Sequence, residues 1–273
     1  MNPFFGMSMR SFSNLRESFQ RGDVVYGAWS ALPSAFAAEL MVSPGVGYVC
    51  VDQQHGLIDY GDCLAMFAAI EARGSVPISR VPANEAWLIA KTLDAGAQGV
   101  IVPLVNNRAE AQKAVEACRY PPQGVRSFGP IRAAVVSAAR DTDTLGNGPL
   151  CFVMVETREG VKNIEEIATT PGLDGIYVGP ADLALGLGLA PDLDKAEPEH
   201  AQAVQDILQA CKRAGIVAGI QCSGGRTGKQ YADKGFQLIT VIKDSALLQA
   251  GAKREIRIAL DQGATPAEQG GYT

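Results

Sequence analysis

Eight short runs of apolar and β-branched residues recur along the chain, and stretches with helical spacing separate them. This alternation is typical of repeated βα units, in which helices connect and cover parallel strands. Most of the runs are apolar throughout, as expected for strands that are buried on both faces. The predicted strands are Val25–Ser30, Tyr48–Asp52, Val76–Val81, Gly99–Leu104, Cys151–Glu156, Gly175–Gly179, Ile216–Gln221 and Leu238–Ile242.

The number of these runs restricts the fold to a few α/β architectures. Eight strands in a chain of 273 residues favour a (β/α)8 TIM barrel over an open, doubly wound sheet. We expect a single domain over residues 1–273, with a core over about residues 24–262 and mobile ends. The predicted helices are Ser34–Met41, Tyr60–Ala72, Glu85–Asp94, Arg108–Cys118, Val161–Thr169, Glu199–Ala214 and Thr227–Lys234.

One long segment, Tyr120–Pro149, is rich in proline and glycine and shows no strong period. Long ordered loops in compact domains usually have a function. We therefore expect this segment to form an excursion at the active site, after the fourth strand.

Charge and composition exclude several classes of protein. The chain has 24 Lys and Arg against 29 Asp and Glu, a net charge of −5, and no basic stripe, so we expect no nucleic-acid partner. The N-terminal sequence MNPFFGMSMR lacks the features of a signal peptide, and no stretch reaches the roughly 18 apolar residues of a membrane span. These features predict a soluble, cytoplasmic protein with a small-molecule substrate.

Cysteine and histidine usage narrows the chemistry further. The 6 cysteines form no CxxC pair, and several lie within apolar strand-like runs, so we expect buried thiols and neither disulfides nor a zinc site. The 2 histidines, His55 and His200, are too few for a metal site with three histidine ligands.

Polar residues gather at the C-terminal ends of the predicted strands. In a TIM barrel these ends form one mouth, which carries the active site. We expect the catalytic and binding residues among them. The residues at these ends are Trp29, Asp52, His55, Arg80, Glu156, Gly179, Pro180, Ala181, Asp182, Lys243 and Asp244.

Glu156 and Asp182 are carboxylates at the ends of successive strands. Paired carboxylates without a cysteine ligand suit a hard divalent cation such as Mg²⁺ or Mn²⁺. Each also has a structural interpretation. Glu156 can pair with Arg158, and Asp182 can cap the helix that follows Pro180.

His55 and Arg80 are candidates for proton transfer and for anion binding. Asp52 lies three residues before His55 and could hold its ring in one tautomer, as a general base requires. Arg80 has the planar fork that binds a carboxylate or a developing oxyanion. The structural alternatives are a His55 that only supports folding and an Arg80 that is solvated or paired with Asp94.

Several segments, in this order, resemble the HpcH/HpaI family of metal-dependent aldolases, which includes 4-hydroxy-2-oxoheptanedioate aldolase and 2-dehydro-3-deoxyglucarate aldolase. The resemblance extends from about Gly27 to about Leu260, and the ETRE and GPADL segments at this spacing are its most specific part. The segments are DQQHG (52–56), the strand that ends in Arg80-Val-Pro, LDAGAQGVIVPLV (93–105), RYPPQGVR (119–126), ETREGVKN (156–163) and GPADLALGLG (179–188).

The resemblance implies a carbon–carbon lyase. Such an enzyme cleaves a 4-hydroxy-2-oxo acid reversibly into pyruvate, or a pyruvate analogue, and an aldehyde, through an enolate stabilised by Mg²⁺, Mn²⁺ or Co²⁺. Carried over by motif, Glu156 and Asp182 would bind the metal. His55 would be the acid/base residue, with Asp52 and Asp94 as its acidic supports.

The resemblance also implies where the substrate binds and how the chains assemble. Arg80 would hold the pyruvyl unit, and backbone N–H groups over Gly179, Pro180, Ala181 and Asp182 would hold its carboxylate. We also expect Trp29, at the end of the first strand, to contact the substrate. The assembly implied is a homohexamer in which neighbouring subunits exchange their C-terminal helices.

Three residues depart from the family pattern near these positions. Many members have a different pair, ending in an acid, where Gln53 and Gln54 stand, and a glutamine where Met154 stands. The site should therefore carry less negative charge and fewer hydrogen-bond donors. From this we expect an uncharged or short aldehyde to react at least as well as succinate semialdehyde.

Two other functions stay open at this point. Lys243 could form a Schiff base with an oxo acid, although the adjacent Asp244 would tend to keep the lysine charged. Alternatively, the chain could be a non-catalytic descendant that binds an oxo acid. The departures at Gln53, Gln54 and Met154 motivate that second alternative.

Overall fold

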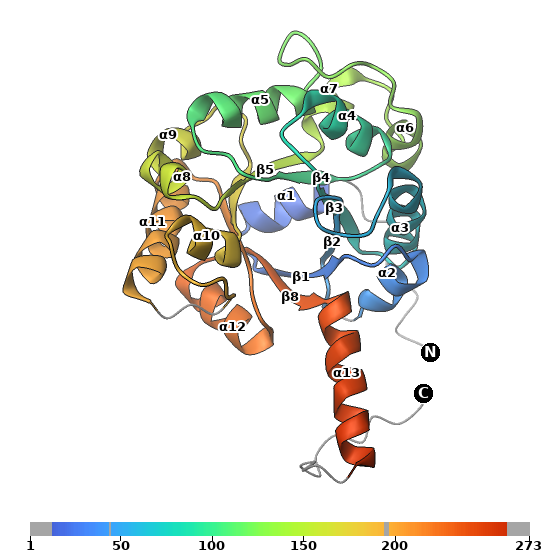
Figure 1. Cartoon of the computed structure of the whole chain (residues 1–273). Coiled ribbons are helices and arrows are strands. Elements are labelled where there is room, and N and C mark those ends of the chain that lie inside the picture. Colours follow the sequence, from blue (N-terminus) through green and yellow to red (C-terminus); the bar gives the residue numbers. More distant parts are fainter. Residues whose placement is uncertain (1–12, 44, 194–196, 261–273) are drawn as a thin grey trace.

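The computed structural model describes residues 13–43, 45–193 and 197–260. Its strands are β1 (Val25–Ser30), β2 (Tyr48–Asp52), β3 (Val76–Arg80), β4 (Gly99–Val102), β5 (Leu150–Val155), β6 (Gly175–Val178), β7 (Val217–Gln221) and β8 (Leu238–Lys243). Each strand pairs in parallel with the next, and β8 pairs with β1, so that the sheet closes into a barrel (Figure 1). The predicted TIM barrel is confirmed, and the open sheet is excluded.

The helices surround this barrel and cap its ends. They are α1 (Ser13–Gln20), α2 (Ala35–Met41), α3 (Tyr60–Ala72), α4 (Ala86–Asp94), α5 (Arg108–Cys118), α6 (Ile131–Ser137), α7 (Thr142–Asn147), α8 (Arg158–Lys162), α9 (Ile164–Ala168), α10 (Pro180–Gly186), α11 (Pro198–Ala214), α12 (Gly225–Lys234) and α13 (Asp244–Ala259). Each predicted helix is present, although the one predicted over Val161–Thr169 is divided into α8 and α9 at Asn163. The expected helix after Pro180 is α10, and the C-terminal helix implied by the family resemblance is α13. No prediction covered α1, α6 or α7.

Helix α1 closes the N-terminal end of the barrel. Leu15 is buried among side chains of the barrel interior, and Phe19 packs edge-on against Phe152 with ring centroids 6.3 Å apart. We expected residues 13–20 to precede the core, and the structure shows that they cover it. Residues 1–12 and 263–273 of the expected mobile ends, and residues 261 and 262 of the expected core, lie outside the described residues.

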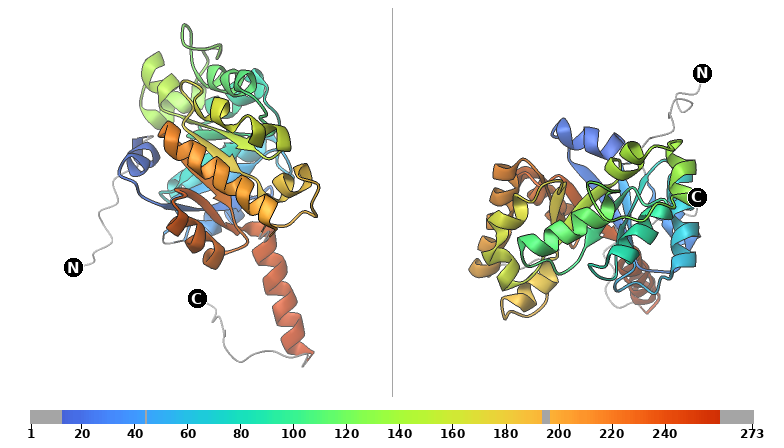
Figure 2. Two further views of the ribbon diagram at one scale, coloured as in Figure 1. Left: turned by 90° about the vertical axis from the view of Figure 1, so that its left-hand side faces the viewer. Right: turned by 90° about the horizontal axis from the view of Figure 1, so that it is seen from above.

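The segment Tyr120–Pro149 contains α6 and α7 and lies toward the same end of the barrel as α1, away from α10 (Figure 2). It follows α5, and a chain that leaves the helix of a βα unit has returned to the N-terminal end of the strands. Arg132 of α6 accordingly donates to the carbonyl of Ala95 at 2.9 Å and to the carboxylate of Glu71 at 2.5 Å, just after α4 and near the end of α3. The expectation of an active-site excursion is therefore wrong within one chain.

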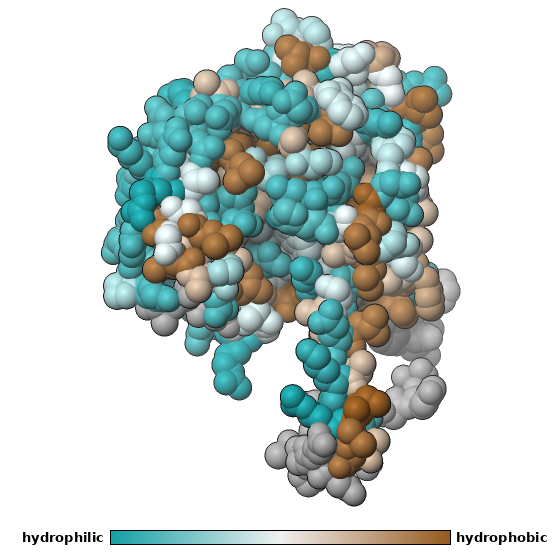
Figure 3. All heavy atoms as spheres, viewed as in Figure 1, coloured by the Kyte–Doolittle hydropathy of each residue, from teal (hydrophilic) through white to brown (hydrophobic). Residues whose placement is uncertain are grey.

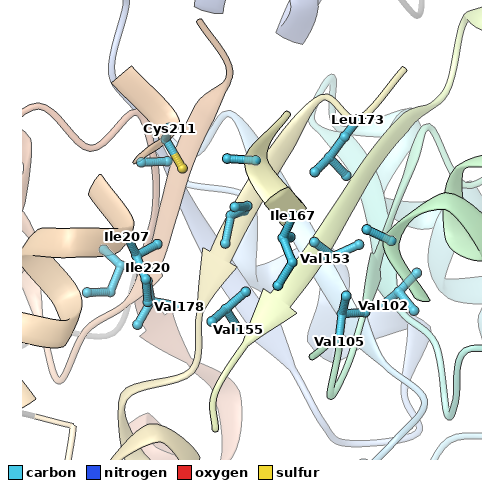
Figure 4. Packing of buried hydrophobic residues seen from close by; sticks show 14 of the residues in the cluster. Val102, Val105, Val153, Val155, Ile167, Leu173, Val178, Ile207, Cys211 and Ile220 are labelled. Atoms are coloured by element: carbon cyan, nitrogen blue, oxygen red, sulfur yellow. The ribbon is translucent and has the colours of Figure 1, made fainter. Parts of the chain in front are cut away.

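Side chains fill both faces of the strands. Inside the barrel, Tyr48 and Tyr177 each form a hydrogen bond with Thr240 Oγ1, at 2.7 and 2.6 Å. Outside it, a continuous apolar cluster packs the strands against helices such as α9 and α11 (Figure 4). Because side chains fill the interior of the barrel, no open channel runs through it. The polar residues at the C-terminal ends of the strands therefore lie together at one mouth.

Helix α13 extends away from the barrel (Figures 1 and 2). Its first residue, Asp244, is its one buried position. Apolar side chains are exposed along the rest of the helix (Figure 3). They are Leu247, Leu248, Ile256 and Ile258, and Leu260 follows just after the helix.

Two predictions about composition can be compared with the structure. All of the cysteines, Cys50, Cys63, Cys118, Cys151, Cys211 and Cys222, are buried and form no disulfide, as expected for thiols that pack as small apolar side chains. Within the part of the chain that the structure describes, no helix has the length and apolar character needed to cross a membrane.

Candidate active site

Asp52 and Arg80 form a buried ion pair at the ends of β2 and β3. The two residues are partners in the strand register, so both side chains lie on the same side of the sheet. Arg80 Nε donates to Asp52 Oδ1 at 2.9 Å, and Nη2 donates to Oδ2 at 2.5 Å. Burial acts to raise the pKa of Asp52, but the hydrogen bonds and charge of Arg80 outweigh it and hold the pKa below its usual value.

Trp29, on β1, holds the ion pair of Asp52 and Arg80 in place. Its indole Nε1 donates to Asp52 Oδ2 at 3.0 Å, and the Arg80 Cζ lies 5.0 Å from the centre of its ring. Arg80 Nη1 donates to no described residue. It is also not buried, so a bound molecule can reach it. Arg80 therefore keeps a donor for an oxygen of a substrate, and the alternative pair with Asp94 does not form.

His55 lies in the turn after β2, and its side chain is exposed. Its backbone N–H donates to Asp52 Oδ1 at 3.2 Å, beside the backbone N–H of Gln54 at 3.1 Å. We expected Asp52 to hold the ring of His55. That expectation is wrong, because Arg80, Trp29 and two backbone N–H groups occupy the carboxylate. Asp52 instead orders the turn that carries His55.

Glu156 follows β5, and its carboxylate is buried with one partner. Leu104 has a left-handed backbone conformation, with φ of 56°, and its N–H donates to Glu156 Oε1 at 2.8 Å. Oε2 is buried without a hydrogen-bond partner among the described residues. Burial and, to a lesser extent, the charge of Asp182 raise the pKa of Glu156 to about 7. The alternative partner, Arg158, bonds to Glu199 at 2.7 Å.

Gly179 brings the backbone of the next strand end against this carboxylate. A Cβ atom there would lie 2.6 Å from Glu156 Oε2 and 2.8 Å from the methyl group of Met154. Any other residue would displace the carboxylate. The close approach explains the glycine at this position, between β6 and α10.

Helix α10 places Asp182 in its first turn, beside Glu156. Of the residues predicted to hold a substrate carboxylate, Pro180 has no N–H to donate, whereas Ala181 and Asp182 have N–H groups in the first turn that need partners outside the helix. The other histidine, His200, is buried in α11, and its Nε2 lies 3.0 Å from the carbonyl oxygen of Pro180. It therefore supports the start of α10.

The two carboxylates fit a divalent cation. Glu156 Oε2 is buried and unpartnered beside a second negative charge on Asp182, and a cation would neutralise both groups. Among the described residues no group of three or more His, Cys, Asp and Glu side chains could hold a metal. A hard cation such as Mg²⁺ needs only one or two carboxylates and completes its coordination with water and substrate oxygens.

Asp94 does not join these residues. It is the last residue of α4, toward the N-terminal end of the barrel, and Arg126 Nη2 donates to it at 2.6 Å. Burial outweighs that contact and raises its pKa. The prediction that Asp94 supports His55 is therefore wrong within one chain.

The residues that depart from the family pattern take different positions. Gln53 turns toward α4, where its Nε2 donates to Ser79 at 2.9 Å and to Thr92 at 3.0 Å, so it does not line the mouth. Met154 belongs to the barrel interior, next to Gly179. Gln54 stays in the turn beside His55.

Comparison with known proteins shows which family the chain belongs to. The family model described as HpcH/HpaI aldolase/citrate lyase matches residues 26–249. The chain belongs to the HpcH/HpaI aldolase/citrate lyase family. It is therefore an enzyme of a lyase family, as the sequence segments indicated.

Similar proteins of the HpcH/HpaI family align with most of the chain. A hydroxypyruvate/pyruvate aldolase of Rhizorhabdus wittichii is 37% identical over 89% of this chain and 97% of its own length. A 4-hydroxy-2-oxo-heptane-1,7-dioate aldolase of Klebsiella pneumoniae is 33% identical over 87% of this chain and 90% of its own. The crystal structure of a family protein from Burkholderia cenocepacia superposes with a TM-score of 0.83 and 34% identity, over 90% of this chain and 99% of that one.

Sequence reasoning missed two contributors to this HpcH/HpaI site. The sequence predicts Leu104 as the last residue of a strand, whereas the residue bends out of β4 and donates its N–H to Glu156. For His200 the sequence predicts no contact with the site, whereas its ring supports the start of α10. Neither role has a local signal in the sequence, since each depends on a contact with a distant segment.

Proposed function

We propose that this chain is a divalent-metal-dependent aldolase. It reversibly cleaves a 4-hydroxy-2-oxo acid into an aldehyde and pyruvate, or an analogue such as hydroxypyruvate. The observation that carries the proposal is the buried, unpartnered Oε2 of Glu156 beside Asp182, at the same mouth as Arg80. The names of the similar aldolases support the pyruvate donor.

Glu156 and Asp182 would hold the cation, Mg²⁺, Mn²⁺ or Co²⁺. When bound there, the cation supplies Lewis-acid stabilisation of the enolate that forms from pyruvate. Arg80, held by Asp52 and Trp29, donates from Nη1 to the oxygen on which negative charge develops, and its fixed orientation makes that donation effective. The N–H groups of the first turn of α10 bind the substrate carboxylate.

His55 would move the proton at the C4 hydroxyl. In cleavage it removes this proton, and in condensation it returns the proton to the aldehyde oxygen. Its exposed position in the turn after β2 lets the ring reach a substrate in the mouth.

The variant His55→Ala tests this role. We expect turnover to fall by about 10²-fold or more, the usual contribution of a positioned acid/base group. The melting temperature should stay nearly unchanged, because the ring is exposed. Steady-state kinetics and thermal unfolding measure both quantities, and a loss of stability with normal turnover would assign His55 a structural role.

The proposed activity is tested by incubating the metal-loaded protein with pyruvate and a panel of aldehydes. Pyruvate consumption and formation of a 4-hydroxy-2-oxo acid are expected with at least one of them. Absence of reaction with every aldehyde, with pyruvate still bound, would instead favour a non-catalytic oxo-acid-binding protein. A borohydride-trapped pyruvate adduct on Lys243 would favour the Schiff-base mechanism.

We also propose an assembly and a location. The exposed apolar side chains of α13 support its packing on a neighbouring copy, as in a homohexamer with exchanged C-terminal helices. The burial of all the cysteines as small apolar side chains suits the reducing cytoplasm.

A further inference from the structure

Lys243, the last residue of β8, lies on the inner side of the barrel. In the pairing of β1 with β8, Ala28 and Ile242 are partners and both pack into the cluster outside the sheet. The next partners are Trp29 and Lys243. Because side chains alternate between the two faces of a strand, Lys243 lies on the same side as Trp29, whose ring is in the interior cluster. It is therefore at the C-terminal mouth.

The ammonium group of Lys243 has no acidic partner within the described part of the chain. The neighbouring carboxylate of Asp244 is turned away and accepts hydrogen bonds from Ser30 Oγ, Ala31 N and Leu32 N, at 2.9, 2.8 and 3.0 Å. From the sequence we expect the adjacent Asp244 to keep the lysine charged. The structure shows that Asp244 instead ties the start of α13 to the loop after β1.

The other acidic group near Trp29 is also satisfied. Asp52 is paired with Arg80, whose charge already compensates it. Lys243 is partly buried, and an unpaired cation in such a position is stabilised by an anion that enters the mouth. This chain therefore offers a second cation there, in addition to Arg80.

The position of β8 in the barrel indicates which part of the substrate this cation meets. Arg80, Glu156 and Asp182, which would hold the pyruvyl unit, lie at the ends of β3, β5 and β6, whereas Lys243 ends β8, beside β1. These three strands belong to the half of the closed barrel centred on β4 and β5, and the ends of β8 and β1 lie across the mouth from that half. The pyruvyl unit thus leaves the β8 and β1 side of the mouth to the aldehyde half.

We propose that Lys243 binds a carboxylate carried by the aldehyde half of the substrate. The inference rests on the proposed aldolase function and specifies its substrate class, an aldehyde acid. It differs from the expectation, drawn from Gln53, Gln54 and Met154, that an uncharged or short aldehyde reacts at least as well as succinate semialdehyde. Gln53 does not line the mouth, and the effect of a cation on an anionic acceptor exceeds that of a neutral amide or thioether.

The test compares aldehydes of equal length with and without a carboxylate. Succinate semialdehyde is matched with butanal, and glyoxylate with glycolaldehyde, each with saturating pyruvate and Mg²⁺. In at least one pair we expect Lys243→Met to lower kcat/KM for the carboxylated aldehyde by about 10- to 100-fold, mainly through KM, as for a lost hydrogen bond between charged groups. The neutral aldehyde should change by less than about twofold.

Two control variants separate charge at this site from other effects. Lys243→Arg keeps the positive charge and should retain most of the preference for the carboxylated aldehyde. Lys113, on α5, forms an exposed ion pair with Glu85. Lys113→Met gives the same change in net charge as Lys243→Met and should leave kcat/KM for both aldehydes unchanged.

The outcomes distinguish this inference from the proposed function. Turnover of neutral aldehydes, with no change for either carboxylated aldehyde in Lys243→Met, would overturn the inference and leave the aldolase standing. Equal loss with all aldehydes, together with borohydride trapping of pyruvate on Lys243, would overturn it in favour of a Schiff base. No turnover of any aldehyde by the wild type would overturn the proposed function and this inference with it.

Discussion

Glu156→Gln is expected to abolish aldol cleavage, with a fall in kcat/KM of about 10³-fold or more, and yet to make the metal-free protein more stable. A metal ligand that is lost removes several kcal/mol of transition-state stabilisation. Without metal, however, the buried Oε2 of Glu156 lacks a partner beside Asp182, and its raised pKa of about 7 means that it carries charge at pH 8. A neutral amide that still accepts from Leu104 should gain about 1 to 2 kcal/mol.

Thermal and urea unfolding at pH 8, with and without Mg²⁺, measure the stability of the metal-free and metal-bound forms of each variant. Mg²⁺ at 100 times its dissociation constant should stabilise the wild type by about 2.7 kcal/mol and leave Glu156→Gln unchanged. Asp182→Asn is the matched control, since Asp182 is less buried: it should lose activity and metal stabilisation without the gain in stability. A metal-free Glu156→Gln protein much less stable than the wild type would mean that Glu156 supports the fold.

Asp52→Asn is expected to cost about 3 kcal/mol of folding free energy at pH 7, and to impair catalysis. It removes the charge that compensates Arg80, and breaking one partner of a buried ion pair leaves the other uncompensated. Because the folded-state pKa of Asp52 is lowered, ionised Asp52 stabilises the fold above its unfolded pKa of about 3.9. That stabilisation is lost as the pH falls through the folded-state value.

Urea unfolding of the wild type and Asp52→Asn across pH provides the measurement. The difference between them should be largest near neutral pH and should shrink as the pH falls below about 4. The double variant Asp52→Asn/Arg80→Met should recover part of the lost stability, because it leaves no unpaired buried charge. A constant difference at every pH would contradict the assigned role of the carboxylate.

The barrel was predictable because its strands are buried on both faces. Runs such as Tyr48–Asp52 and Cys151–Glu156 are apolar enough to stand out without an alignment, and their C-terminal ends indicate one mouth. The predictions for Asp94 and Tyr120–Pro149 are wrong for a single topological reason. Asp94 ends α4 and Tyr120–Pro149 follows α5, and a chain that has completed a helix has returned to the opposite end of the barrel.

The pairing of side chains at the mouth could not be predicted. The sequence places Asp52 three residues before His55, but the three-dimensional contacts assign its oxygens to Arg80 and Trp29. The partner of Glu156 is the backbone of Leu104, and a left-handed residue that is not glycine leaves no signature in a single sequence.

Exchange of the methyl protons of pyruvate in D₂O, followed by NMR, tests the central claim most directly. Enolate formation at Glu156 and Asp182 needs no aldehyde, so the measurement isolates the metal-dependent step from acceptor specificity. We expect no enzymatic exchange after exhaustive EDTA treatment, recovery with Mg²⁺, Mn²⁺ or Co²⁺, and none in Glu156→Gln under either condition. Undiminished exchange in the EDTA-treated wild type would contradict a metal-dependent aldolase.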